Sequence, residues 1–210
     1  MRSTWPSSWG VRRCSSPPTG FNLQAMQLTN PELTSRIKTI LSAHGTPGPS
    51  LTFELSGSGL LEAPATALES PVRLQMMGCR LSIDDLGAGF SSLQRLCQLP
   101  FNEIKLDGEF VRTLEHEPRC RAVISSTLTL GETLGMTVVI EGIGTEEQRQ
   151  ELVPLGCNQG QGYLRERPMS GADLLSWLDA RRISDPSVFQ EGYRYDDQPS
   201  LATGKCGHCH

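Results

Sequence analysis

Short apolar segments, each with a polar side chain within it or directly after it, recur along this chain of 210 residues and constrain its fold more than any other feature. Short apolar runs predict buried strands, and helical patterns lie between several of them. The spacing from one segment to the next matches the length of a βα unit. Polar groups at the same end of successive parallel strands predict the rim of a βα barrel, where active sites lie. The six segments are 21–23 with Asn22, 51–55 with Glu54, 81–83 before Asp84 and Asp85, 104–106 with Lys105, 138–140 before Glu141, and 160–164 with Gln161.

The adjacent carboxylates Asp84 and Asp85 follow one of these apolar runs directly. Two unpaired carboxylates in a partly dry site repel each other and lose hydration. One or two divalent metal ions with oxygen ligands would compensate for both effects. A solvated turn is the alternative interpretation of an isolated Asp-Asp pair. The polar groups on the other predicted strands favour the metal site.

Composition limits the class of protein. With 37% hydrophobic and 20% charged residues, the chain suits one globular domain with a real core. A net charge of −4 gives no reason to expect a nucleic-acid polymer as partner, although metals could bridge a small anionic ligand to acidic residues. No apolar run approaches the roughly 18 residues of a membrane span. Seven cysteines are an odd number, and five of them are scattered, which, without an export signal, predicts reduced thiols and a cytoplasmic location.

The composition also predicts the domain limits. Residues 1–19 are rich in Ser, Pro and Arg and are expected to be irregular, residues 20–183 form the barrel domain, and residues 184–210 form a flexible polar tail. The tail ends in the pattern C-x-x-C-H at 206–210, which is typical of c-type haem attachment. Haem attachment requires export, and no export signal is recognised. The alternatives are that the tail binds a soft metal adventitiously or that it has no function, and we favour a tail without function.

Helix termini are also predicted. Asn30, followed by Pro, is typical of a helix start, and Gly45 of its end. A long helix over 119–134 should end at Gly135. Thr145 and Gln148 have the spacing of a capping box.

Several ordered motifs resemble those of one known family. Residues 84–93 read Asp-Asp-Leu-Gly-Ala-Gly-Phe-Ser-Ser-Leu, similar to the family's Asp-Asp-Phe-Gly-Thr-Gly-Tyr-Ser-Ser-Leu. Similar matches occur at 22–28, 54–58, 105–111, 141–148 and 156–168. From about residue 21 to about residue 182, the chain resembles the EAL domain, the cyclic di-GMP phosphodiesterase domain of bacterial signalling.

The resemblance implies an α/β, TIM-barrel-like fold that hydrolyses cyclic di-GMP to a linear dinucleotide with Mg²⁺ or Mn²⁺, in the regulation of biofilm and motility. By the same carry-over, Asn22, Glu54 and Asp84 would bind one metal ion, and Asp84 would bridge to a second ion held by Asp85 and Glu141. Lys105, acting together with Asp85 and Glu141 as the catalytic set, would orient and activate the attacking water, and Gln161 would help to hold the water or phosphate. Two bridged cations lower the pKa of the water between them and neutralise charge that develops on phosphorus.

The chain also departs from the family pattern. No Glu-Ala-Leu segment, whose Glu is a metal ligand in the family, precedes Asn22, and about six of the barrel's eight βα units are recognised. Gly57 and Gly144 stand where the family has glutamates. We therefore expect an incomplete barrel with an exposed edge at the strand of Asn22, and weak or impaired turnover. The alternatives are an inactive module that binds cyclic di-GMP or a protein, and a fragment of a longer phosphodiesterase; a homodimer or a protein partner is compatible with each.

Overall fold

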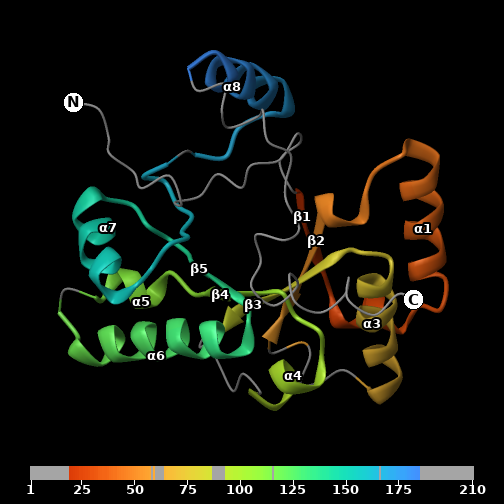
Figure 1. Ribbon diagram of the computed structural model, residues 1–210, viewed down its shortest axis with the longest axis horizontal. Coiled ribbons are helices and arrows are strands. Elements are labelled where there is room, and N and C mark those ends of the chain that lie inside the picture. Colours follow the sequence, from red (N-terminus) through yellow and green to blue (C-terminus); the bar gives the residue numbers. More distant parts are fainter. Residues whose placement is uncertain are drawn as a thin grey trace, which may run out of the picture.

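A parallel five-stranded sheet with helices between its strands forms the centre of the molecule (Figure 1). The computed structural model describes residues 19–57, 59, 64–86, 93–114, 116–165 and 167–184. The strands are hydrogen-bonded in chain order, as expected for successive βα units. They are β1 (Thr19–Leu23), β2 (Leu51–Ser56), β3 (Arg80–Leu86), β4 (Glu103–Leu106) and β5 (Thr137–Ile140).

Helices connect these strands and pack on one face of the sheet. The α-helices are α1 (Leu33–His44), α3 (Glu69–Met76), α4 (Leu93–Gln98), α5 (Glu109–Arg112), α6 (Pro118–Leu134), α7 (Glu146–Leu152) and α8 (Gly171–Ser184). Short 3₁₀ turns cover Ala25–Thr29, Gly48–Ser50, Ala65–Leu68 and Val153–Leu155. Helix α3 packs against β3, and α6 packs against β4 and β5, whereas α8 lies apart from the strands at the top of the view (Figure 1).

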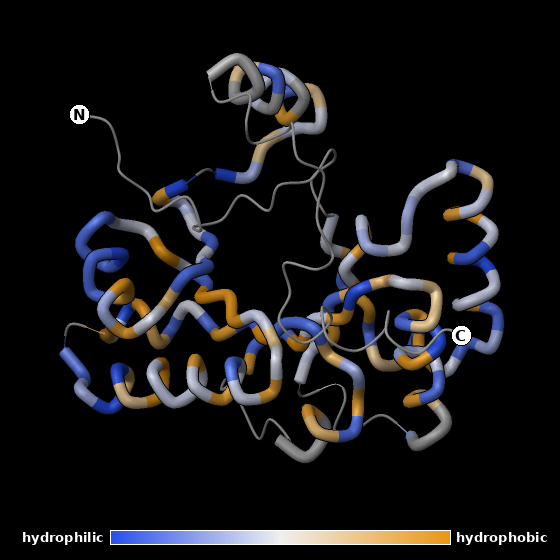
Figure 2. The backbone as a smooth tube through the Cα atoms, viewed as in Figure 1, coloured by the Kyte–Doolittle hydropathy of each residue, from blue (hydrophilic) through white to orange (hydrophobic). Residues whose placement is uncertain are grey.

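The two faces of the sheet differ in chemistry, because successive side chains of a strand point to opposite faces. The helix-facing set is apolar: Leu55, Ile83 and Ile104 are register partners, and each is at most 1% exposed. Figure 2 shows hydrophobic residues gathered along β4 and β5. The opposite face is polar and includes the register partners Ser82 and Glu103. A parallel sheet covered on both faces usually has continuous apolar strands, so the alternation here indicates a polar barrel interior.

The helix termini agree with the sequence signals, with one shift. Gly45 and Gly135 end α1 and α6 with φ of 60° and 67°, the left-handed conformation that glycine adopts without penalty. Thr145 and Gln148 form the predicted capping box of α7. Helix α1 begins at Leu33, later than predicted, because the Asn30 side chain accepts a hydrogen bond from the backbone N–H of residue 32 at 2.9 Å and forms a turn first.

The sixth predicted strand, over 160–164, is reduced to one isolated bridge between Ile140 and Gly160. The Gln161 N–H still donates to the Ile140 carbonyl at 2.9 Å, so this segment occupies the position beside β5. It then forms a turn beside Ile143: the N–H of Leu164 donates to the Ile143 carbonyl at 3.0 Å, and the N–H of Arg165 donates to the carbonyl of Gly162 at 3.1 Å. The prediction of six full strands is therefore corrected to five strands and one bridge within the described residues.

The predicted exposed edge lies at β1. Within the described part of the chain, β1 pairs only with β2, and its residues are mostly exposed. Among the described helices, none is long and apolar enough to cross a membrane. The predicted irregular segment at 1–19 and the tail at 184–210, including the C-x-x-C-H pattern, fall almost entirely outside the described residues. These two limits stay predictions.

Candidate metal site at the C-terminal end of the sheet

Three carboxylates meet where β3 and β5 end. One oxygen from each of Asp84, Asp85 and Glu141 lies within 4.8 Å of the others. Metal–oxygen bonds of about 2.0–2.6 Å would allow oxygens at this separation to share one cation. An all-carboxylate donor set suits a hard divalent ion such as Mg²⁺ or Mn²⁺. The chemistry of the donors therefore fits the predicted metals.

An irregularity in β3 directs both aspartates into this cluster. In a regular strand, neighbours such as Asp84 and Asp85 would point to opposite faces. Here the register with β4 shifts between Ile83 and Leu86. Asp85 has φ of 55°, the one positive value among the described non-glycine residues, and its N–H donates to Asp84 Oδ1 at 3.1 Å. Such backbone strain is concentrated at functional sites, where surrounding structure maintains it.

Lys105 lies between two of the predicted site carboxylates. Its Nζ is 2.8 Å from Glu54 Oε2 and 3.1 Å from Glu141 Oε1, and the residue is 7% exposed. Burial alone would lower the pKa of Lys105, but the hydrogen bond to Glu54 and the charges of Glu141, Glu54 and Asp84 outweigh it and raise the pKa. The ammonium therefore stays charged at neutral pH and partly neutralises the surrounding acids.

The acids nevertheless repel one another. Burial raises the pKa of Glu141, the Lys105 charge opposes that rise, and the charges of Asp84 and Asp85 add to it. The pKa of Asp85 is likewise raised, first by burial and then by Asp84 and Asp107. A carboxyl group with a raised pKa holds its proton more tightly than an isolated acid would. A bound cation would favour the ionised forms and relieve this repulsion.

Gln161 completes the surroundings of Glu141. Its Nε2 donates to Glu141 Oε1 at 2.5 Å, the same oxygen that Lys105 contacts. The bridge between Ile140 and Gly160 brings this side chain to the site, although the segment is not a full strand.

Asn22 and Glu54 lie on the other side of the site. They are register partners on β1 and β2, and the Glu54 carboxylate does not belong to the group of three carboxylates. Glu54 Oε2 contacts Lys105, and Oε1 would lie 2.3 Å from a Cβ placed at Gly20. The Glu54 carboxylate thus leans over the edge strand, in space that glycine leaves free. Asn22 is exposed on that edge.

A family model for the EAL domain matches residues 8–168 of the chain. The chain belongs to the EAL domain family. It is 46% identical over 157 residues to the cyclic di-GMP phosphodiesterase RocR of Pseudomonas aeruginosa, a match that covers 75% of this chain. It spans 40% of the length of RocR and between 19% and 26% of seven further curated relatives.

Solved EAL structures have the same fold. The chain matches the PaMucR phosphodiesterase in its c-di-GMP complex with a TM-score of 0.69 and 36% identity, over 74% of this chain and 63% of that one. It also matches Klebsiella pneumoniae BlrP1 in a complex with manganese and cyclic di-GMP, with a TM-score of 0.65 and 29% identity, over 69% of this chain and 37% of that one. The predicted α/β, TIM-barrel-like EAL fold is confirmed.

Two positions at which this EAL domain differs from the family pattern lie near the site. Gly57 follows β2 and is buried. A Cβ placed at Gly144 would have its nearest neighbour, Gln148 Oε1, at 3.7 Å, an ordinary contact that leaves room for a side chain. Residues 87–92 of the Asp-Asp motif lie outside the described residues.

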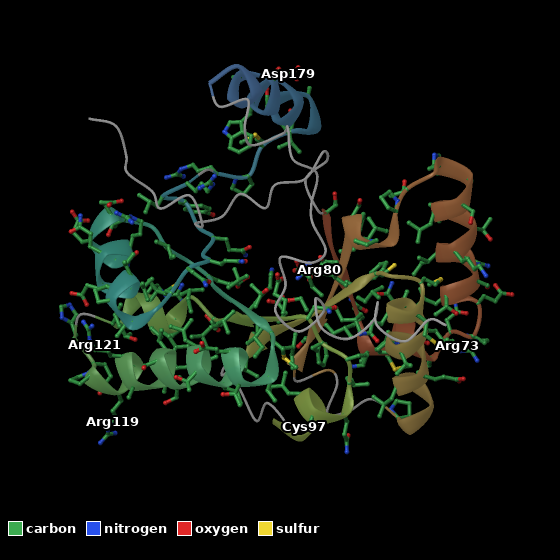
Figure 3. The ribbon with its side chains drawn as sticks, viewed as in Figure 1. Arg73, Arg80, Cys97, Arg119, Arg121 and Asp179 are labelled. Carbon is green, nitrogen blue, oxygen red and sulfur yellow. The ribbon has the colours of Figure 1, made fainter. Side chains whose placement is uncertain are left out.

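Sequence reasoning missed a buried polar group on the interior face of this EAL domain. Arg80, Ser82 and Glu103 are 1%, 0% and 8% exposed, and Arg80 Nη2 lies 4.0 Å from Glu103 Oε2. Figure 3 labels Arg80 among the strands in the middle of the molecule. The alternation Arg80, Ser82, Asp84 along β3 was the available signal, because it places all three on the face that holds the site.

Proposed function

We propose that this EAL domain hydrolyses cyclic di-GMP to the linear dinucleotide with two Mg²⁺ or Mn²⁺ ions, and that turnover is weak. The observation that carries the proposal is the convergence of Asp84, Asp85 and Glu141 around one point beside Lys105. The 46% identity to a cyclic di-GMP phosphodiesterase supports this substrate.

In this proposal, the metal ligands come from both sides of the site. Asp84, Asp85 and Glu141 would hold one ion, and Asp84, Asn22 and Glu54 would hold the other. The ions would lower the pKa of a water molecule and neutralise charge on the phosphodiester. Asp85, whose side chain is exposed beside Asp84 and Glu141, would also take up the proton of the attacking water.

Lys105 and Gln161 position the reactants. Because its pKa is raised, the Lys105 ammonium is a hydrogen-bond donor and a positive charge, which suits it to orient the water and to attract the phosphodiester. The Gln161 amide, which donates to Glu141 at 2.5 Å, fixes that carboxylate and can donate to a phosphate oxygen.

The proposed weakness of turnover has two supports. Gly57 and Gly144 lack the carboxylates found at these family positions, and supporting groups of this kind often contribute about 10–100-fold in metal affinity or activity. In addition, Glu54 Oε2 is engaged with Lys105 Nζ at 2.8 Å, so this carboxylate is less available to a metal ion.

One assay tests the proposal. The 210-residue chain is incubated with cyclic di-GMP and Mn²⁺, and the linear dinucleotide is measured by chromatography, with a chelator in the control. Slow, metal-dependent formation of the linear product is expected. Product formation that is unaffected by the chelator would contradict the metal requirement, and turnover at the usual rate of the family would contradict the weakness.

A second candidate function is binding of cyclic di-GMP without turnover. The contacts of Lys105 with Glu54 and Glu141 favour it, since an ammonium held by two carboxylates is less available to a water molecule. Calorimetric binding of cyclic di-GMP in the presence of Ca²⁺ or Mn²⁺, without product, would distinguish this function from hydrolysis. We further propose a cytoplasmic site of action in bacterial signalling, either alone, as a homodimer or with a protein partner. The four described cysteines, all free thiols, support the location.

A further inference from the structure

The segments that follow β4 and β5 meet through two glycines, one of which directly follows the site residue Glu141. Gly108 follows Asp107, and Gly142 follows Glu141. A Cβ placed at Gly142 would lie 2.9 Å from Gly108 Cα, and a Cβ placed at Gly108 would lie 3.0 Å from Gly142 Cα. Real Cβ atoms essentially never approach other atoms within 3.0 Å, so the two backbones are as close as they are because neither residue has a side chain.

Gly142 is restricted in a second way. Its φ is 70°, in the left-handed region that residues with a Cβ adopt only at a cost. On the other side of Glu141, a Cβ at Gly162 would lie 2.4 Å from the Ile143 nitrogen and 2.2 Å from its carbonyl oxygen. The segment that carries Glu141 is therefore in close backbone contact with both of its neighbours.

These contacts matter because of what Glu141 reaches. Its Oε1 lies 3.1 Å from Lys105 Nζ and 2.5 Å from Gln161 Nε2, and a carboxylate oxygen lies within 4.8 Å of the oxygens of Asp84 and Asp85. Making room for a methyl group between the two backbones would move the segment by a distance comparable to the tolerance of a metal–oxygen bond.

We propose that Gly142 is a positioning residue of the metal site: its backbone contact with Gly108 holds the Glu141 carboxylate where it can share a cation with Asp84 and Asp85. This inference rests on the proposed function, because it assigns Glu141 as a metal ligand.

The test compares Gly142→Ala with Gly156→Ala in the full chain. Gly156 also has a positive φ, 92°, but a Cβ there would have no neighbour within 4 Å. Both variants should lose stability through the left-handed backbone, as measured by thermal unfolding. Calorimetry with Mn²⁺ should show affinity on the order of tenfold weaker for Gly142→Ala and unchanged affinity for Gly156→Ala. Gly108 is not in the left-handed region, so Gly108→Ala should weaken Mn²⁺ binding less than Gly142→Ala does. If Gly142→Ala does not fold, Gly108→Ala takes its place in the comparison.

Two results would overturn the inference: unchanged Mn²⁺ affinity in Gly142→Ala, or equal weakening in both alanine variants. If the unmodified chain does not bind Mn²⁺, the proposed metal-dependent function is contradicted. A measurement that needs no metal then tests the role of Gly142 separately. The ¹⁵N resonance of the Lys105 ammonium reports its contact with Glu141. It should shift in Gly142→Ala and not in Gly156→Ala, and an unshifted resonance in Gly142→Ala would again overturn the inference.

Discussion

On the two sides of the candidate site, the backbone restrains the positions of the proposed metal ligands to different degrees. On the side formed by β3 and β5, three carboxylates converge, and an irregular backbone and close glycine contacts set their positions. On the side formed by β1 and β2, Asn22 is exposed on an edge strand, and Glu54 turns toward Lys105 and Gly20. Strand pairing alone does not explain this difference, because β2 is paired on both sides whereas β5 has only the Gly160 bridge beyond it. The comparison shows that local backbone features, the irregularity of β3 and the glycine contacts after β5, restrain the three carboxylates, whereas Glu54 on the regular strand β2 is placed by its side-chain contacts.

The largest effect should come from the convergent side. Asp84→Asn removes the charge of the proposed bridging ligand, so any hydrolysis should fall below detection and Mn²⁺ affinity should drop by roughly 100-fold or more. Calorimetry and the product assay measure both. Asp179→Asn, a change on the exposed surface of α8, is the control and should change neither. Full Mn²⁺ affinity in Asp84→Asn would show that the metal does not bind at the group of three carboxylates.

Lys105 joins the two sides, and its removal should affect folding. Lys105→Met leaves the partly buried carboxylates Glu54 and Glu141 without their cation, which we expect to cost about 3 kcal/mol of unfolding free energy. Urea unfolding at pH 7 with a chelator measures this loss. Lys38→Met, on the exposed surface of α1, should change stability by less than about 0.5 kcal/mol. Adding Glu54→Gln to Lys105→Met should restore part of the loss, and a further loss would show that Glu54 has another partner.

A smaller effect is expected on the side formed by β1 and β2, where one substitution should increase the affinity for Mn²⁺. In Gly20→Ala, the new methyl group meets Glu54 Oε1, which lies 2.3 Å from the Cβ position, so the flexible carboxylate must move off β1. If it moves toward the other carboxylates, Mn²⁺ affinity should rise by roughly threefold, a modest effect for a ligand adjustment. Gly171→Ala, where a Cβ would meet nothing within 4 Å, is the control. Unchanged or weaker binding in Gly20→Ala would show that the present Glu54 orientation already suits the metal.

The smallest expected effect is a gain in unfolding free energy when the proposed metal ligand Asp85 loses its charge. Asp85→Asn removes a repelling charge, and Asn tolerates positive φ well, so the metal-free chain should gain about 0.5 kcal/mol, a small value because the side chain is exposed to solvent. Because the folded-state pKa of Asp85 is raised, its ionisation destabilises the fold. The gain should therefore be present at neutral pH and disappear as the pH falls below the ordinary aspartate value of about 3.9. Urea unfolding at pH 7 and pH 3.5 measures the difference, and a gain that persists at low pH would assign it to the backbone.

Much of the fold was predictable because local patterns agree with it. The apolar runs at 51–55 and 81–83 coincide with β2 and β3, and Gly45 and Gly135 end helices because a left-handed residue is needed there. The sixth strand was not predictable in length. The segment around Gly162 has the composition of a strand, but it forms one bridge and then a turn that stays hydrogen-bonded to the Ile143 backbone.

By itself, the sequence determined the order of the βα units, the face on which polar side chains of the regular strands lie, and the residues that could bind a metal, because these follow from strand periodicity and chemical type. Tertiary structure alone decided which residues meet. The shifted register of β3 turns Asp85 toward Asp84, and the contact between Gly108 and Gly142 sets Glu141 beside them. It also decided that Lys105 contacts both Glu54 and Glu141 and so links the two sides of the site. These outcomes depend on distances between segments far apart in the chain, and a local pattern contains no information on such distances.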